Sequence, residues 1–87
     1  MPTLIAFIQT TWPKIRVGLY KQDDGRFQFV EEGIEENAAD AESWFPYRES
    51  RLYDDISEAK TDMIDFYATQ VEDGYEVDPS SVVVVDV

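Results

Sequence analysis

The sequence of 87 residues contains no cysteine and no histidine. The absence of cysteine excludes both a disulfide framework and a thiolate metal site. The absence of histidine removes the usual general base near neutral pH and the commonest metal ligand. The four glycines are isolated from one another, so the chain has no glycine-rich phosphate-binding loop. We therefore predict a non-catalytic protein that needs no cofactor.

Long apolar runs are also missing. The N-terminal run from Leu4 to Ile8 has no basic residues before it, and it is too short for a signal peptide or a membrane span. We therefore expect a cytoplasmic protein with no membrane association. A hydrophobic fraction of 44% is sufficient for the core of one small domain spanning residues 1–87.

Basic residues are scarce after position 26, where only Arg48, Arg51 and Lys60 occur. Residues 1–30 contain four basic and two acidic residues, whereas residues 31–87 contain three basic and seventeen acidic ones. The net charge of −12 therefore comes from the second part of the chain. Such a chain repels DNA, RNA and anionic lipids, so we do not expect it to bind nucleic acid directly.

Residues 14–32 show the clearest local pattern, KIRVGLYKQDDGRFQFVEE. Two runs of alternating apolar residues flank positions 23–25, Asp-Asp-Gly, which is typical of a β-hairpin whose glycine adopts a positive φ. A three-residue loop places Leu19 opposite Phe29, with the apolar side chains on one face. A two-residue turn would pair Leu19 with Val30 and separate them, so we predict the three-residue register.

Three further strands are expected. They cover Thr3 to Gln9, Glu42 to Tyr47, with a proline suited to a sheet edge, and Ser81 to Val87. The last segment is nearly continuous in valine, which is typical of a strand covered on both faces, and its alternative is an exposed tail. The segment from Gly33 to Ala41 is predicted to be a connection.

A helix from about residue 55 to 72 follows from the spacing of its apolar residues. Asp55 and Glu58 have the spacing of a capping box at its start. Residues 73–74, Asp-Gly, supply a stop signal. The predicted fold is therefore α+β, a small, mostly antiparallel sheet with one amphipathic helix packed on it, in the order β-β-β-β-α-β.

The acidic residues form two groups. The stretch at 31–42, EEGIEENAADAE, has six carboxylates and no basic residue. On the predicted helix, Glu58, Asp62 and Asp65 share a sector of about 60°, again without a basic residue. A solvated surface usually mixes charges of both signs, because pairs at i+4 are weakly stabilising. Uncompensated charge therefore favours either a basic partner or a role in solubility alone.

The segment at 44–55, WFPYRESRLYDD, combines aromatic residues with arginine, which are types enriched at interface hot spots. The alternative is that its aromatic side chains belong to the core and its arginines neutralise nearby acids. The candidate partner-binding residues are the acidic Glu35, Glu36, Asp40, Glu42, Asp62 and Asp65 and, from this segment, Trp44, Tyr47, Arg48, Arg51 and Tyr53.

Three functions remain open from the sequence. The first is an interaction protein that docks on a basic protein surface. The second is a nucleic-acid mimic that blocks a DNA- or RNA-binding protein. In size and acidity alone, the chain resembles small phage inhibitors of restriction, repair or CRISPR systems. The third is a small hydrolase or metal-binding domain using Asp54, Asp55 and Glu58. We expect a monomer, with a homodimer as the alternative.

Overall fold

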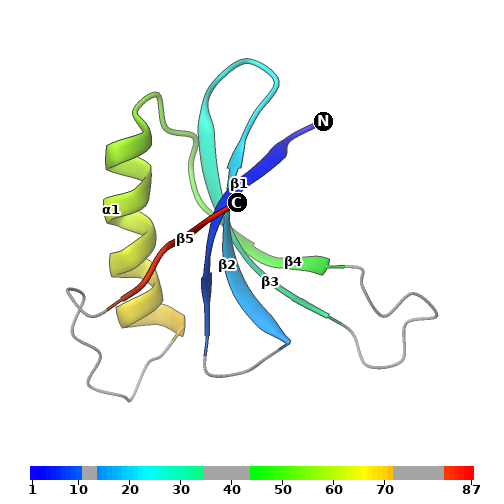
Figure 1. Cartoon of the computed structure of the whole chain (residues 1–87), viewed down its shortest axis with the longest axis vertical. Helices are drawn as coiled ribbons and strands as arrows, with labels where there is room; N and C mark the ends of the chain where they lie inside the picture. Colours follow the sequence, from blue (N-terminus) through cyan, green and yellow to red (C-terminus); the bar gives the residue numbers. More distant parts are fainter. Residues whose placement is uncertain (11–13, 35–43, 72–81) are drawn as a thin grey trace.

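The computed structural model describes residues 1–10, 14–34, 44–71 and 82–87. Within these ranges one antiparallel sheet has the strand order β4-β3-β2-β1-β5. Its strands are β1 (Thr3–Gln9), β2 (Ile15–Lys21), β3 (Phe27–Ile34), β4 (Trp44–Glu49) and β5 (Val85–Asp86). One helix, α1 (Ile56–Phe66), is extended by a π-helical segment, η1 (Tyr67–Val71), and lies on one side of the sheet (Figure 1). The predicted α+β fold and element order are confirmed.

The β2–β3 hairpin has the predicted register. Leu19 pairs with Phe29, and both side chains are buried. At the tip, the backbone N–H of Gly25 donates to the carbonyl of Gln22 at 3.0 Å. Gly25 has a φ of 87°, a conformation that costs glycine little because it has no Cβ.

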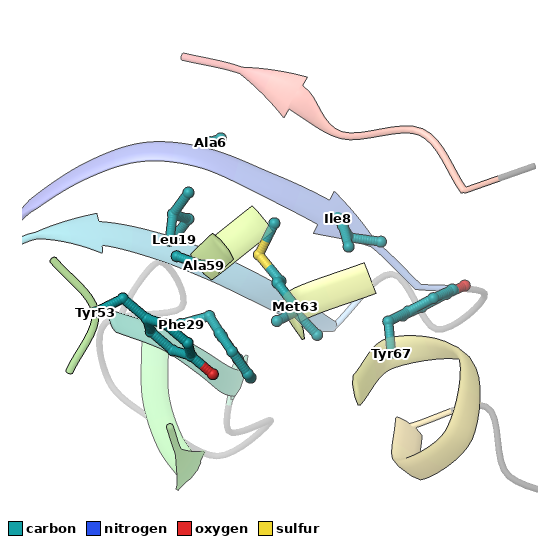
Figure 2. Packing of buried hydrophobic residues seen from close by; sticks show 9 residues of the cluster. Ala6, Ile8, Leu19, Phe29, Tyr53, Ala59, Met63 and Tyr67 are labelled. Carbon is teal, nitrogen blue, oxygen red and sulfur yellow. The ribbon is translucent and has the colours of Figure 1, made fainter. Parts of the chain in front are cut away.

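The core lies between α1 and the face of the sheet that α1 covers. Figure 2 shows Met63 of α1 reaching toward Leu19 and Ile8, and these three side chains are at most 2% exposed. Phe29 stacks on Tyr53 with 5.9 Å between ring centroids. This packing follows from the two periodicities of the sequence, since alternate strand residues and one helical stripe supply the apolar surface.

The helix begins as predicted but with different capping contacts. Asp55 is its N-cap, and its carboxylate accepts a hydrogen bond from the backbone N–H of Ser57 at 2.7 Å. The predicted capping box is wrong in its second half. Glu58 instead accepts a 2.6 Å hydrogen bond from Arg51, outside the helix. The predicted stop at Asp73-Gly74 lies outside the described residues.

Two strand boundaries differ from the prediction. Gly33 was expected in a connection but belongs to β3, where it pairs with Phe45. β4 begins at Trp44 and continues to Glu49, two residues beyond the predicted end. Both differences arise because β3 pairs with β4 along residues 30–34, beyond the point where the apolar alternation of β3 ends. β4 is an edge strand, as Pro46 indicated, and its register shifts between Glu31 and Glu32.

The prediction that the C-terminal valines are covered on both faces is wrong. β5 is the other edge strand, and the odd-numbered valines in and beside it are exposed: Val83 by 71%, Val85 by 42% and Val87 by 75%. Val82 and Val84 pack against the core. The valine run is therefore one-sided, because within the described residues helix α1 covers only one face of the sheet (Figure 1).

We call the face of the sheet opposite α1 the open face. Strand alternation and the register of β1, β2 and β3 determine which side chains lie on this face. They are Phe7, Arg16, Gly18, Tyr20, Gln28, Val30 and Glu32. This face carries the polar and charged side chains of Arg16, Tyr20, Gln28 and Glu32 together with the apolar Phe7 and Val30. It is one of two candidate functional surfaces.

Candidate functional site

The first surface is one end of the sheet, away from the hairpin tip. Ile34 pairs with Trp44 at this end, and the N–H of Ile34 donates to the carbonyl of Lys14 at 2.9 Å. The end of η1 reaches the same region, since Arg48 donates to the carbonyl of Gln70 at 3.2 Å. β5 runs antiparallel to β1, so Val82 lies toward it as well. We call this region, where β1, β3 and η1 end, the acidic end.

Two acidic segments of the chain are joined to this region. Residues 35–43 leave from Ile34 and return at Trp44, and residues 72–81 leave from Val71 and return at Val82. Each of these segments contains four acidic residues and no basic one. The predicted partner-binding residues Glu35, Glu36, Asp40 and Glu42 lie in the first segment, outside the described residues. Both acidic segments are therefore joined to described residues at this end of the fold.

The basic side chains are mostly used inside the fold. Five of the seven pair with carboxylates of the same chain: Arg16 with Glu32, Arg26 with Asp24, Arg48 with Glu31, Arg51 with Glu58 and Lys60 with Asp86. Four of these contacts are 2.6 or 2.7 Å long, and the lysine contact is 3.4 Å. The other two basic residues are Lys14, which lies beside Ile34, and Lys21.

The acidic sector of α1 is not free of basic neighbours, which corrects the sequence interpretation. Arg51 pairs with Glu58 and lies 3.9 Å from Asp62, whose carboxylate also accepts a 2.8 Å hydrogen bond from the Tyr53 hydroxyl. Asp65 is exposed, and its carboxylate has no hydrogen-bond or ion-pair partner among the described residues. The charges of Glu58 and Asp62 are compensated by Arg51, which precedes the helix, and the spacing of residues within the helix cannot show this.

The aromatic segment divides between core and surface. Tyr53 is 4% exposed and stacked on Phe29, so it has little surface to offer a partner. Tyr47 is 60% exposed and rests against Gly33, where an added Cβ would lie 2.6 Å from its ring. Trp44 is half-buried.

The arginines of this segment are also occupied. Arg48 lies 5.0 Å from the centroid of the Phe66 ring, and Arg51 lies 3.9 Å from that of Tyr53. Each therefore combines an ion pair with a cation–π contact. Their use within the fold matches the alternative that the sequence left open, in which arginine neutralises nearby acids.

The second surface is the middle of the open face, which the sequence analysis missed. Glu32 is 4% exposed although it is ionisable. Its carboxylate accepts from Arg16 Nε at 2.7 Å and from the Tyr20 hydroxyl at 2.8 Å. Gly18 leaves the space that this carboxylate fills, because a Cβ there would lie 2.7 Å from Oε1. A signal was available: extending the predicted hairpin register by three pairs places Arg16 opposite Glu32.

Two tyrosines are affected by these networks. Burial raises the pKa of Tyr20 above its usual value of 10.0, and its hydrogen bond to Glu32 raises it further. Burial likewise raises the pKa of Tyr53, and the hydrogen bond to Asp62 adds to the effect. Both phenols are therefore held in the protonated form as hydrogen-bond donors.

The corner formed by Asp54, Asp55 and Glu58 does not form a metal site. Asp55 caps α1 and Glu58 pairs with Arg51, and no metal-ligating group of three or more side chains occurs in the described part of the chain. Across residues 1–10, 14–34, 44–71 and 82–87, no helix has the length and apolar character needed to cross a membrane. Comparisons with protein-family models, curated proteins and solved structures gave no match.

Proposed function

We propose that this chain is a non-catalytic cytoplasmic interaction protein that docks, through its acidic end, on a basic surface of another protein. The proposal is carried by the internal pairing of five of the seven basic side chains, while segments 35–43 and 72–81 contain eight acidic residues and no basic one. The lack of histidine and cysteine supports a role without catalysis.

Segments 35–43 and 72–81 together contain eight acidic residues. Concentrating like charges in a small domain destabilises the folded state by self-repulsion. A basic partner relieves that repulsion and is steered toward the acidic end, so the arrangement favours fast, salt-sensitive association. This advantage is specific to a binding protein.

The first experiment is affinity capture from a bacterial lysate at about 50 mM and about 500 mM sodium chloride. The higher concentration screens the attraction between exposed charges much more strongly than the lower one. We expect a basic protein that is retained only at the lower concentration. The identified partner is then used in association measurements with variants of the chain.

The decisive variant is Glu35→Gln with Glu36→Gln, which removes two charges from the first acidic segment. Its matched control is Asp23→Asn with Asp54→Asn, which removes two charges near the hairpin tip. We expect only the first variant to associate more slowly and with a weaker salt dependence. If the two variants associate equally well, the acidic end serves solubility rather than recognition.

The same partner also tests nucleic-acid mimicry. Duplex DNA or RNA is added as a competitor for the captured protein. Displacement of the chain would show that its carboxylates occupy a phosphate-binding surface, and binding unaffected by competitor would exclude mimicry while leaving docking on a basic surface in place.

A further inference from the structure

A groove of about 210 Å³ lies on the open face, and its lining includes two carboxylates and one aromatic ring. Glu32 forms part of its wall and is nearly fully buried. Glu49, on β4, is exposed, and its carboxylate has no partner among the described residues. Tyr20 supplies the ring, with its hydroxyl fixed on Glu32 at 2.8 Å. Tyr20, Glu32 and Glu49 come from three adjacent strands, β2, β3 and β4.

The rest of the groove suits a long side chain with a charged end. Pro2, Val30 and Pro46 supply apolar surface, and the side chains of Gln22 and Gln28 supply amide groups. Among the described residues, no basic side chain lines it; Arg16 lies to one side, paired with Glu32 and 4.0 Å from the centroid of the Trp44 ring. The groove therefore offers the Glu49 carboxylate, amide groups and apolar contact.

Three of the four arginines of the chain are held in the same way. Arg16 lies over Trp44 and pairs with Glu32, Arg48 lies over Phe66 and pairs with Glu31, and Arg51 lies over Tyr53 and pairs with Glu58. In each case a guanidinium meets an aromatic ring and a carboxylate from another part of the chain. The groove has the same two components, the Tyr20 ring and the Glu49 carboxylate, and no arginine pairs with Glu49 among the described residues. The Glu32 carboxylate in its wall is already paired with Arg16 and fixes the Tyr20 hydroxyl.

We propose that this groove receives an arginine side chain of the basic partner. The inference rests on the proposed function and names the group that the partner inserts. A guanidinium is favoured over an ammonium because its planar set of donors can serve several acceptors at once and stack on a ring. The apolar part of the groove then contacts the aliphatic portion of the arginine.

The test is an NMR titration of the isotope-labelled full chain with N-acetyl-L-arginine amide. We expect saturable shifts concentrated on the side-chain amides of Gln22 and Gln28 and on the backbone amides of Gly18 and Val30. The citrulline analogue is a neutral control of nearly the same shape. It should bind at least about fivefold more weakly, since it cannot form charge-assisted hydrogen bonds.

The variant Glu49→Gln removes one exposed charge from the groove and should weaken binding of the arginine probe about two- to fivefold. Asp54→Asn is the matched control, because it removes an exposed charge outside the groove, from a carboxylate with no hydrogen-bond or ion-pair partner among the described residues. It should leave the affinity unchanged. Equal effects of the two variants, equal binding of citrulline, or shifts centred on α1 would overturn the groove proposal.

Failure here is distinguishable from failure of the proposed function. If the groove does not bind the probe but Glu35→Gln with Glu36→Gln still slows partner association, docking through the acidic end stands and the groove assignment is wrong. If the groove binds arginine but that variant associates normally, the groove rather than the acidic end recognises basic groups.

Discussion

Glu32 and Arg16 face each other across strands β3 and β2, with 2.7 Å between Oε1 and Nε. Their side chains are only 5% and 16% exposed. The pair lies on the sheet face away from the apolar core, where Gly18 leaves room for the carboxylate. The same carboxylate also accepts a hydrogen bond from the Tyr20 hydroxyl and lines the groove on the open face.

Breaking the ion pair between Arg16 and Glu32 should destabilise the fold strongly. Arg16→Gln leaves Glu32 buried without its cationic partner, and such a loss destabilises a fold by about 3 kcal/mol or more. Urea unfolding followed by tryptophan fluorescence measures the change. The control is Arg26→Gln, which breaks an exposed pair with Asp24 and should leave the urea midpoint nearly unchanged. Similar midpoints for the two variants would show that the buried pair contributes no more than the exposed one.

The hairpin tip depends on the backbone conformation of Gly25. Gly25→Val should lower the free energy of unfolding by about 1 to 3 kcal/mol, because a β-branched residue is strained at a φ of 87°. The space around the position is open, so a steric clash does not contribute. Gly25→Asn should lower the free energy of unfolding by less, since asparagine tolerates a positive φ better than valine does. Equal losses for the two variants would contradict this explanation.

Salt should stabilise the isolated chain. The net charge of −12 is concentrated after residue 30, and adding sodium chloride from about 10 to about 150 mM shortens the screening length from about 30 to 8 Å. We expect the melting temperature to rise over this range. A falling melting temperature would mean that the internal ion pairs, such as Arg51 with Glu58, dominate over repulsion.

Alkaline pH should destabilise the fold through Tyr20 and Tyr53. Their folded pKa values lie above the usual 10.0, so the unfolded chain releases these protons at a lower pH than the folded one. Their stabilising contribution is fully present below about pH 10 and is lost as the pH rises through the folded pKa. Urea midpoints at pH 9 and pH 11 measure the loss. Tyr53→Phe should make the decrease smaller, and an unchanged pH dependence would exclude Tyr53 as a cause.

We expect the chain to be monomeric. The β4 edge contains Pro46, which has no backbone N–H to donate, and β5 is only two residues long. Sedimentation velocity at two concentrations about tenfold apart should give the same sedimentation coefficient. An increase that Val85→Lys abolishes would instead identify the exposed valines in and beside β5 as a dimer interface.

Local patterns in the sequence were sufficient to predict most of the fold. The alternation around Leu19 and Phe29, together with Gly25, determined the hairpin register, because one face of that sheet must be buried. Asp55 determined the start of the helix, since its side chain satisfies a backbone N–H that the helix leaves unpaired. Both features depend on residues close together in the chain.

Other features were decided only by tertiary structure. The valines at 82–87 look alike in sequence, but their exposure depends on which face α1 covers. Glu58 had the spacing to close a capping box, yet Arg51 reaches it from outside the helix. Glu32 stands in an acidic run and is nevertheless buried beside Arg16 and Tyr20. Sequence spacing describes neighbours along one element, whereas burial and ion pairing depend on side chains that packing brings from other elements.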